Sequence, residues 1–563
     1  MKPGTLLLTA AVVLPGAWAL GADATDGPKP VVSYDIKHDV SPPLRLIPVA
    51  PPRPGPNRQI PLGRVERKNG IYPAPLLEDP LLRGQGAPAA PMPPPLVSFD
   101  GTSDDDNAAV IGFRVVPPDT NGDVGPNHYV QFNNLIFEIF NKSGTSVFGP
   151  VAGNTPWAGF GGPCQTNNDG DPIALYDQLA DRWILSQFSI DEGTQCVAVS
   201  TTPDPTGSYF RYAFLVTPGG QNDYPKFGLW PDAYYSSYRR FPGSSFRIVA
   251  AAFDRAQMLA GAPAQMVTFN IVPPSGLGCL GSGDCYDGIL PAHLEGMTPP
   301  PAGAPGLFVT AFDDEFNQGS GGGTPNPAQD FYKIWRFHVD FAVPANSTLT
   351  GPINVASAEF DENLCGGNPC VPQPAPGEIL DHLSFFTMYR PSYRNLGGIE
   401  SLLVNNTVNV GGSRAGIRWA EIRNLATTPS LFQSGTHAPA DAVHRWMGSM
   451  AMDVNGNIAL GFSASSTSLF PSIRYVGRLA GDPAGTLPQT EVDLIAGAGV
   501  QTGSFNRWGD YSAMSVDESD ECTFWYTTEY YANTGSFDFK TRIGSFRFPT
   551  CIVPVQLLGF TVE

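Results

Sequence analysis

The sequence predicts an all-β protein, a single β-propeller of about seven blades that follows a proline-rich N-terminal extension. Three observations in its 563 residues lead to this fold class. Candidate strands are short and alternate with clusters of turn residues, and sustained helical periodicity is missing. In addition, one phrase of sequence recurs at intervals of roughly fifty to sixty residues, which is close to the length of a long propeller blade.

The first residues have the layout of a secretory signal peptide. A short basic start precedes an almost wholly apolar run at 6–14, and small residues follow at 17–22. This order is typical of exported proteins. Pro15 and Gly16 break the apolar run, which is therefore shorter than the ~20 residues that span a bilayer. We expect residues 1–22 to be removed and the mature protein to be secreted, extracellular or periplasmic, without a membrane span.

Residues 23–96 have an unusual composition for a folded domain. Proline pairs occur at 42–43 and 51–52 and a triplet at 93–95, among scattered Arg and Lys. Proline fixes φ and removes a backbone donor, so such a stretch favours extended geometry without a core of its own. We expect an extension or tether that packs little, followed by a propeller domain at 97–563.

The repeated phrase consists of a glycine, a short apolar strand, a turn built on Asp, Asn, Gly or Pro, and an aromatic strand. Its five copies lie at 124–130, 171–183, 227–235, 446–457 and 508–525. Each copy is interpreted as two neighbouring strands of one blade, because Asn-Gly and Asp tolerate the backbone of a tight turn. Degenerate copies at 307–312 and 399–404 bring the number of blades to seven, with six or eight left open.

Two of these copies resemble a known family. Asn-Arg-Trp-Gly-Asp-Tyr-Ser at 506–512, with Thr-Phe-Trp-Tyr at 523–526, resembles exported bacterial β-propeller-like proteins of largely uncharacterised function. Gly-Asp-Pro at 170–172 and Asp-Arg-Trp at 181–183 resemble an earlier repeat of that family. The resemblance covers most of residues 119–550 and implies a fold rather than an activity.

A looser resemblance concerns sialidase-type propellers. The turns at Asp453 and Asp517 are similar to the Asp-box turns of those proteins. They lack the full Ser-x-Asp-x-Gly-x-x-Trp pattern, so this similarity is an analogy at the level of the fold.

The eight cysteines are expected to form disulfides. They fall into sequence-local couples, which are Cys164 with Cys196, Cys279 with Cys285, Cys365 with Cys370, and Cys522 with Cys551. No couple has the C-x-x-C spacing of a zinc or redox site, and export places them in an oxidising compartment. The spacing alone leaves other connectivities open.

Charge and motifs exclude several classes of function. A net charge of -19 lacks the basic footprint of a nucleic-acid binder, so no nucleic-acid partner is expected. The sequence contains no G-x-S-x-G elbow, no H-E-x-x-H helix, no P-loop and no dinucleotide fingerprint after a strand. A serine-triad or zinc-helix hydrolase is therefore unsupported.

Polar residues at the expected starts of inner strands are the candidates for a site, since these starts converge at the mouth of a propeller's channel. The ligand-binding candidates are Asp171, Lys226, Tyr389, Arg390, Arg445, Arg507 and Asp510. Two facing carboxylates can run glycoside hydrolysis, and arginine can bind the carboxylate of an acidic sugar. The same types of residue also hold neighbouring blades together. We favour such an inter-blade clasp, with Asp171, Arg445, Arg507 and Asp510 meeting near the axis.

A structural calcium ion is the cofactor that the sequence suggests. Asp119, Asn121 and Asp123 copy the opening of an EF-hand loop, but the glycine and the terminal glutamate of that loop are missing. Clusters of Asp, Asn and Gly usually mark only a turn.

Three functions remain as hypotheses. The first is a propeller that binds an extracellular glycan or cell-surface polymer, with or without cleavage. The second is a non-catalytic scaffold or adhesion module that binds another protein. The third is a sialidase-like glycoside hydrolase. The sequence leaves open whether the protein is an enzyme and which oligomeric state it has.

Overall fold

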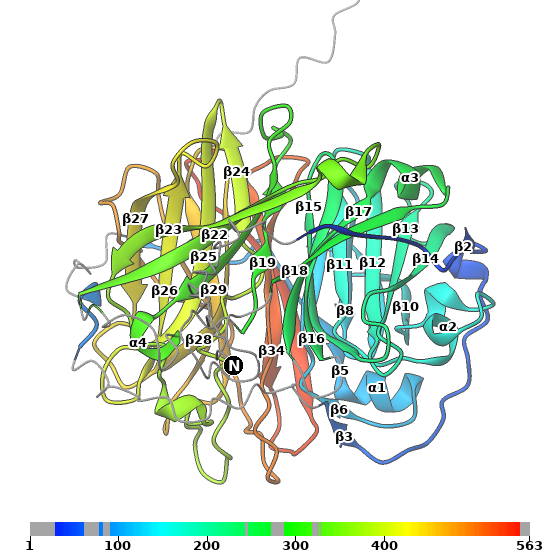
Figure 1. Ribbon diagram of the computed structural model, residues 1–563. Helices are drawn as coiled ribbons and strands as arrows, with labels where there is room; N and C mark the ends of the chain where they lie inside the picture. The colour runs from blue at the N-terminus through cyan, green and yellow to red at the C-terminus, as the bar shows by residue number, and fades with distance from the viewer. Residues whose placement is uncertain are drawn as a thin grey trace, which may run out of the picture.

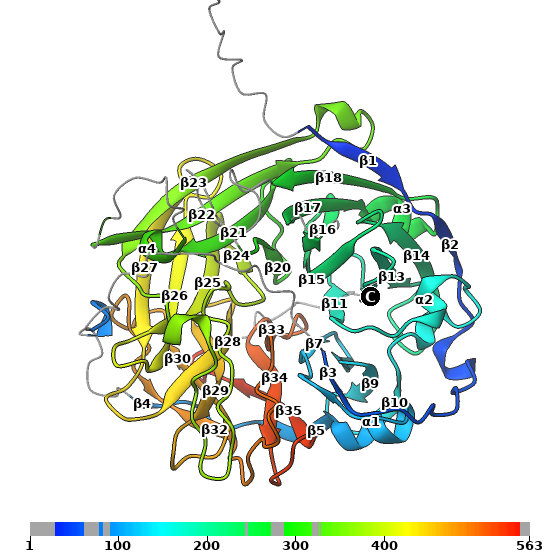
Figure 2. The same cartoon turned by 60° about the horizontal axis from the view of Figure 1, so that its bottom comes forward.

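Seven sheets radiate from a central axis and form a closed ring (Figures 1 and 2), which confirms the seven-bladed β-propeller. The structure is a computed structural model that describes residues 29–60, 78–82, 90–241, 246–271, 287–317, 326 and 328–551. The expected signal peptide lies outside these residues. Among the described helices, none is long and apolar enough to cross a membrane.

The first three blades are built from consecutive hairpins. Blade 1 contains β7 (Asn121–Val124), β8 (His128–Asn133), β9 (Ile136–Asn141) and β10 (Ser146–Ala152). Blade 2 contains β11 (Ile173–Asp177), β12 (Arg182–Ser189), β13 (Thr194–Ser200), β14 (Tyr209–Leu215) and, from the extension, β2 (Lys37–Val40). Blade 3 contains β15 (Gln221–Leu229), β16 (Ala233–Phe241), β17 (Arg247–Asp254), β18 (Gln265–Ile271) and β1 (Val31–Tyr34).

The other four blades include two with short innermost strands. Blade 4 contains β19 (Leu290–Pro291), β21 (Gly306–Phe312), β22 (Gln329–His338) and β23 (Thr348–Ala358). Blade 5 contains β20 (His293–Glu295), β24 (Ser392–Leu396), β25 (Ile399–Asn409), β26 (Ala415–Arg423) and β27 (Ser430–His437). Blade 6 contains β28 (His444–Met452), β29 (Ile458–Ser465), β30 (Ser472–Arg478) and β32 (Val492–Ile495). Blade 7 contains β33 (Ala513–Val516), β34 (Thr523–Tyr531), β35 (Phe539–Arg547) and β5 (Val97–Ser103).

A few small elements lie outside the blades. Two parallel pairs join β3 (Arg58–Gln59) to β6 (Val115–Val116) and β4 (Ala90–Pro91) to β31 (Gln489–Thr490). The helices are α1 (Asp104–Val110), α2 (Pro163–Thr166), α3 (Arg255–Ala260) and α4 (Asp314–Asn317). Short 3-10 turns occur at Leu44–Leu46, Thr155–Trp157, Pro344–Asn346 and Cys365–Gly367.

Each of the five repeated phrases falls on the inner hairpin of a blade, as the sequence predicts, although the copy at 446–457 ends with the turn before β29. The turn between β28 and β29, for example, is built on Asp453, whose carboxylate accepts hydrogen bonds from the backbone N–H groups of Asn455 and Asn457 at 2.9 Å. Neighbouring blades pack through aromatic side chains, such as Tyr475 of blade 6 stacked on Phe546 of blade 7 at 4.0 Å. Edge and face contacts of this kind make the inter-blade core specific as well as apolar.

An N-terminal strand closes the ring. The strand β5 pairs antiparallel with β35, so that Phe99 lies opposite Ile543. Arg542 adds an ion pair of 2.7 Å to Asp100, a residue 442 positions earlier in the chain. Blade 7 is therefore assembled from both ends of the propeller domain, and β5 covers the outer edge of β35.

The proline-rich extension packs more than we expected. The strand β1 adds an edge to β18, and β2 adds an edge to β14. Leu44 is fully buried, and the carboxylate of Asp79 forms a fully buried ion pair of 2.8 Å with Arg418 of blade 5. The expectation failed because outer sheet edges supply the backbone partners that a short proline-flanked strand cannot supply for itself.

Three of the four expected disulfides are present in the described residues. Cys164 is bonded to Cys196, Cys365 to Cys370, and Cys522 to Cys551. The fourth couple, Cys279 with Cys285, lies outside the described residues. The last bond fastens the end of the described chain to the turn between the two inner strands of blade 7.

Candidate functional site

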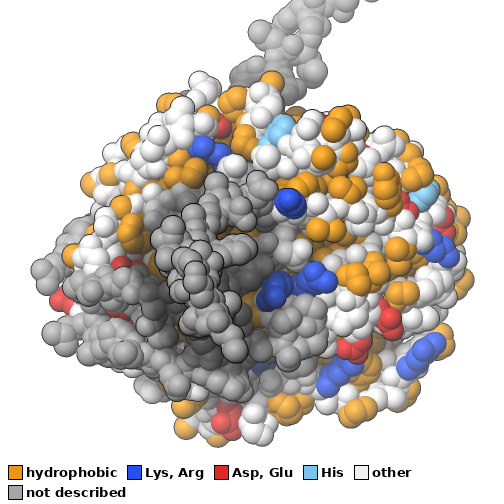
Figure 3. Space-filling view, viewed as in Figure 1, with side chains coloured by type: hydrophobic (Ala, Val, Ile, Leu, Met, Phe, Trp, Pro, Cys, Tyr) orange, Lys and Arg blue, Asp and Glu red, His pale blue; other side chains and the backbone are white. Residues whose placement is uncertain are grey.

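On the coloured part of the side shown in Figure 3, charged side chains are interspersed with apolar ones. By contrast, several charged side chains are buried near the axis, at the end of the channel where the inner strands begin. We call Asp119, Asp171, Lys226, Arg507 and Asp510 the mouth cluster. Four of these five were candidate ligand or clasp residues from the sequence, and their side chains are at most 5% exposed.

Unusual backbone geometry accompanies the mouth cluster. Asp119, Asp171 and Asp510 have positive φ angles of 48°, 46° and 58°, and Tyr224 in β15 has one of 55°. Aspartate is one of the few residues other than glycine that adopts this left-handed conformation readily. Non-glycine residues with positive φ are often found at functional sites, where the surrounding structure holds the strained backbone in place.

The Arg507 guanidinium is neutralised by two carboxylates. It lies 3.1 Å from Asp381 and forms a second ion pair with Asp510. The backbone N–H of Trp508 donates to Asp381 at 2.8 Å, which fixes that carboxylate. Burial lowers the pKa of Arg507, but the two adjacent carboxylates more than offset this effect and raise it above its ordinary value.

The Lys226 ammonium lies between two aromatic rings. Its Nζ is 3.4 Å from the ring centroid of Tyr224 and 3.9 Å from that of Tyr511, and it donates to the carbonyl of Pro225 at 3.0 Å. Burial lowers the pKa of Lys226 to about 8, opposed by Asp171 and the neighbouring carboxylates. The rings and the carboxylates together hold a cation at this buried position.

The carboxyl groups of the cluster do not ionise independently. Burial raises the pKa of Asp171 to about 7 against the opposing charge of Lys226, while Asp223 and Asp510 raise it further. Burial and the charges of Asp510 and Asp171 also hold the pKa of Asp119 well above its ordinary value. Like charges this close cannot all be present at once, so the cluster shares protons near neutral pH.

Two oxygens of the cluster lack a partner among the described residues. These are Oδ1 of Asp119 and Oδ1 of Asp510, both buried. Buried acceptors nearly always receive a hydrogen bond from protein, water or ligand. The mouth cluster therefore offers acceptor sites to a donor-rich molecule.

Two further candidates, Tyr389 and Arg390, form a separate buried group around the axis. Arg390 lies 3.2 Å from Glu295 and 3.4 Å from Asp123, and its side chain is fully buried. The hydroxyl of Tyr389 donates to the carbonyl of Phe227 at 2.9 Å. Burial raises the pKa of Glu295 to about 7 although Arg390 opposes the shift. These contacts link blades 1, 3 and 5.

The residues expected to bind calcium have different partners. The Asp123 carboxylate accepts hydrogen bonds from the N–H groups of Val124 and Tyr176 and faces Arg390. Oδ1 of Asn121 accepts from the N–H of Ala174, and Asp119 belongs to the mouth cluster. The side chains of Asn121 and Asp123 thus link β7 of blade 1 to β11 of blade 2. Calcium binding at these three residues stays a prediction.

Arg445 lies apart from the mouth cluster, contrary to our expectation. Its guanidinium binds Asp441 at 2.9 Å and also Glu491, which in turn contacts His437 at 2.7 Å. These residues and Arg414 line a surface cavity of about 540 Å³ beside blade 6. Although Arg445 lies at the start of the inner strand β28, its guanidinium binds these nearby carboxylates and not the residues of the mouth cluster.

The sequence analysis did not identify two groups of residues that the structure brings together. Asp381 lies in a loop without repeat character, and nothing in its surroundings marks it as a partner of Arg507. A cluster of Asp313, Glu315 and Asp330 was also missed. The run of acids at 313–315 directly after an apolar strand was the signal available for it.

We expect Asp171 to make stability depend on pH. Its folded-state pKa of about 7 lies above the unfolded value of 3.8, so the folded state holds a proton that the unfolded state has lost. Stability from this group is complete below pH 4 and is lost as the pH rises towards 7, with a slope of up to ~1.4 kcal/mol per pH unit. Asp171→Asn should flatten the curve in this window. Urea unfolding of both proteins from pH 4.5 to 7.5 measures this dependence. If the free energies of unfolding of the two proteins changed with pH in parallel, Asp171 would not be the group responsible.

No protein-family model and no curated protein matches the sequence. Distant similarity exists to three solved structures of glycan-active proteins. The α-L-arabinofuranosidase of Fusarium graminearum with arabinobiose is 10% identical, with a TM-score of 0.29 over 57% of this chain and 92% of that chain. A Hadza microbial sialidase is 12% identical, with a TM-score of 0.31 over 76% and 74%. An ulvan lyase, a polysaccharide lyase bound to -[GlcA(1-4)Rha3S]-, is 10% identical, with a TM-score of 0.33 over 81% and 97%. Similarity this distant assigns neither ligand nor reaction to the chain.

Proposed function

We propose that this protein is a secreted β-propeller that binds an extracellular glycan at the mouth cluster. The observation that carries the proposal is the gathering of partnerless carboxylate oxygens, on Asp119 and Asp510, beside an ammonium and two tyrosine rings. Sugar hydroxyls are donors for such oxygens and acceptors for an ammonium. The signal-peptide layout and the three disulfides fit an oxidising compartment.

Cleavage of the glycan is a second candidate function. It is supported by the pKa of Asp171, which burial brings to about 7, next to carboxyls that titrate with it. A carboxyl group whose pKa lies near neutral, beside a second carboxyl group, is an arrangement that general acid–base catalysis uses.

One observation favours the hypothesis of a non-catalytic scaffold. The mouth cluster is at most 5% exposed, and Arg507 joins a carboxylate of its own loop to Asp381, which precedes blade 5. This is the geometry of an inter-blade clasp. The sialidase hypothesis has less support, because Arg390, Arg445 and Arg507 each already bind two carboxylates.

Binding measurements on Asp171→Asn test the glycan proposal. The amide keeps the shape, the positive φ and the acceptor for the N–H of Tyr224, but removes the charge and the proton. We expect the wild-type protein to bind a glycan saturably on an array, and the variant to bind it at least about tenfold more weakly, which corresponds to ~1.4 kcal/mol. Its Tm should stay close to that of the wild type at pH 5.

Asp104→Asn is the matched control for this experiment. Asp104 is equally buried and has a pKa raised by burial to about 7, but it lies on α1 outside the mouth cluster. The control should bind like the wild type. Product analysis of the same incubations separates binding from cleavage. Absence of saturable glycan binding, or equal binding by Asp171→Asn, would favour the scaffold.

A further inference from the structure

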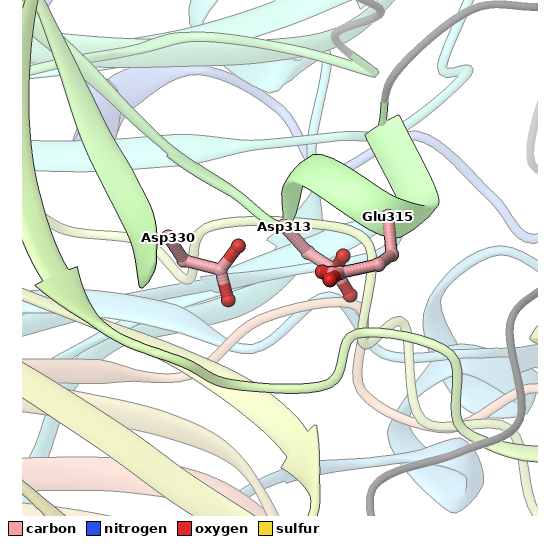
Figure 4. A group of neighbouring side chains, drawn as sticks. All are labelled: Asp313, Glu315 and Asp330. Atoms are coloured by element: carbon pink, nitrogen blue, oxygen red, sulfur yellow. The ribbon is translucent and has the colours of Figure 1, made fainter. Parts of the chain in front are cut away.

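A second concentration of carboxylates lies on blade 4. Asp313 follows β21, Asp314 and Glu315 lie on α4, Asp330 lies on β22, and Glu359 follows β23. Oxygens of Asp313, Glu315 and Asp330 lie within 4.8 Å of one another. Figure 4 shows the Asp313 and Glu315 carboxylates side by side, with that of Asp330 approaching from the neighbouring strand.

Backbone donors hold two of these carboxylates in place. Asp330 accepts from the N–H groups of Asp314 at 2.8 Å and Phe360 at 2.7 Å. Asp313 accepts from the N–H groups of Phe316 and Glu362, both at 2.8 Å. The sequence thus builds a rigid frame in which carboxylates of α4 and β22 face one another in spite of their mutual repulsion.

Three further oxygens are buried and lack any partner among the described residues. They are Oδ1 of Asp314, Oε2 of Glu315 and Oε2 of Glu359. Asp314 is 5% exposed and Glu359 is 6% exposed, so bulk water reaches little of either side chain. The carboxyl group of Glu315 interacts directly with those of Asp314 and Glu359, which places these three carboxyl groups in the same cluster.

The charge of the cluster is uncompensated. None of its five carboxylates forms an ion pair with a described Lys, Arg or His. Arg418, which donates to the carbonyl of Glu359, is neutralised by Asp79. A buried group of this kind is stable only when protons or a cation neutralise it.

We propose that Asp313, Asp314, Glu315, Asp330 and Glu359 form a calcium site on blade 4. The donor set is made of oxygens alone, which excludes the nitrogen and sulfur ligands that zinc prefers. Five carboxylates, each able to bind through one or two oxygens, supply the six to eight ligands that Ca²⁺ takes, whereas Mg²⁺ demands an octahedron and keeps several waters. The ion would tie α4 to β22 and to the chain that leaves β23.

Calcium titration of the full-length protein after EDTA treatment tests the proposal. We expect one saturable Ca²⁺ site per chain by calorimetry, with Mg²⁺ at least about tenfold weaker. At roughly 100 times Kd, calcium should raise Tm by about 2–3 °C. Absence of saturable binding, or tighter binding of Mg²⁺ or Zn²⁺, would overturn the assignment.

Asp330→Asn locates the site. The variant should bind Ca²⁺ at least about tenfold more weakly. In EDTA its Tm should stay within about 5 °C of the wild type, because relief of the carboxylate repulsion offsets the loss of one of the two acceptors for backbone N–H groups. Asp104→Asn, which removes an equally buried carboxylate from α1, should bind Ca²⁺ like the wild type. Equal affinity of Asp330→Asn and the wild type would show that calcium binds elsewhere and would refute the site.

Discussion

Replacing Arg507 by alanine is expected to lower the free energy of unfolding by about 3–5 kcal/mol. The guanidinium is 4% exposed and is the ion-pair partner of both Asp381 and Asp510. Its removal leaves two buried carboxylates facing each other at a position where Asp171 and Asp119 already compete for protons. Urea unfolding near pH 7 measures the loss.

The exposed pair of Arg45 with Asp204 provides the control for this variant. These side chains are 54% and 48% exposed at 3.1 Å, so Arg45→Ala should change stability by less than about 1 kcal/mol. If Arg507→Ala unfolds at the wild-type urea concentration but no longer binds glycan, Arg507 belongs to the ligand site and not to an inter-blade clasp.

Replacing Asp79 by alanine is expected to cost a similar amount, about 3–5 kcal/mol. Its carboxylate is fully buried, lies 2.8 Å from Arg418 and accepts a hydrogen bond of 3.0 Å from the Thr436 hydroxyl. The variant would strand a buried guanidinium inside blade 5. This result would show that the extension is part of the fold, and Arg45→Ala serves again as the exposed control.

Thermal and urea unfolding of Asp79→Ala give the measurement. Limited proteolysis adds a second readout, since loss of this anchor should expose the extension to cleavage before the blades. An Asp79→Ala protein with wild-type stability would mean that residues 78–82 contribute nothing to the propeller, as the proline content had suggested.

The blades were predictable because their determinants are local. Short apolar strands and Asn-Gly or Asp turns recur at intervals close to the length of a blade, so the inner hairpin of each blade can be recognised within one short stretch of sequence. The extension was not predictable by the same reasoning. Val31–Tyr34 and Lys37–Val40 carry no burial pattern of their own, and they become strands only because β18 and β14 offer free edges.

The mouth cluster was predictable in part. Asp171, Arg507 and Asp510 lie in the segments that lead into the inner strands β11 and β33, and ring geometry brings such segments together. Arg445 has the same place in its repeat, but a bulge between Trp446 and Ser449 and the nearby acids redirect it. Position in a repeat thus fixes where a Cα lies, whereas the direction of a long side chain depends on partners from distant segments.

The calcium expectation shows the same limit. Asp119, Asn121 and Asp123 match a loop pattern in sequence, but Asn121 and Asp123 lie on one face of β7 and accept backbone N–H groups of β11, and Asp123 also faces Arg390. The carboxylates of blade 4 come from three segments between 313 and 359 that only the folded blade brings together. A spacing pattern cannot reveal such a site, because its ligands share no local motif.

The closing strand also sets the order in which the chain can fold. The strand β5 is made early, but its partner β35 follows more than four hundred positions later, as the 442-residue separation of Asp100 and Arg542 shows. A chain made from its N-terminus therefore carries an unpaired strand until nearly the whole domain has been made. Contacts this distant in sequence make folding slow and leave edges open to association. Until β35 is made, β5 has no antiparallel partner with which to complete blade 7.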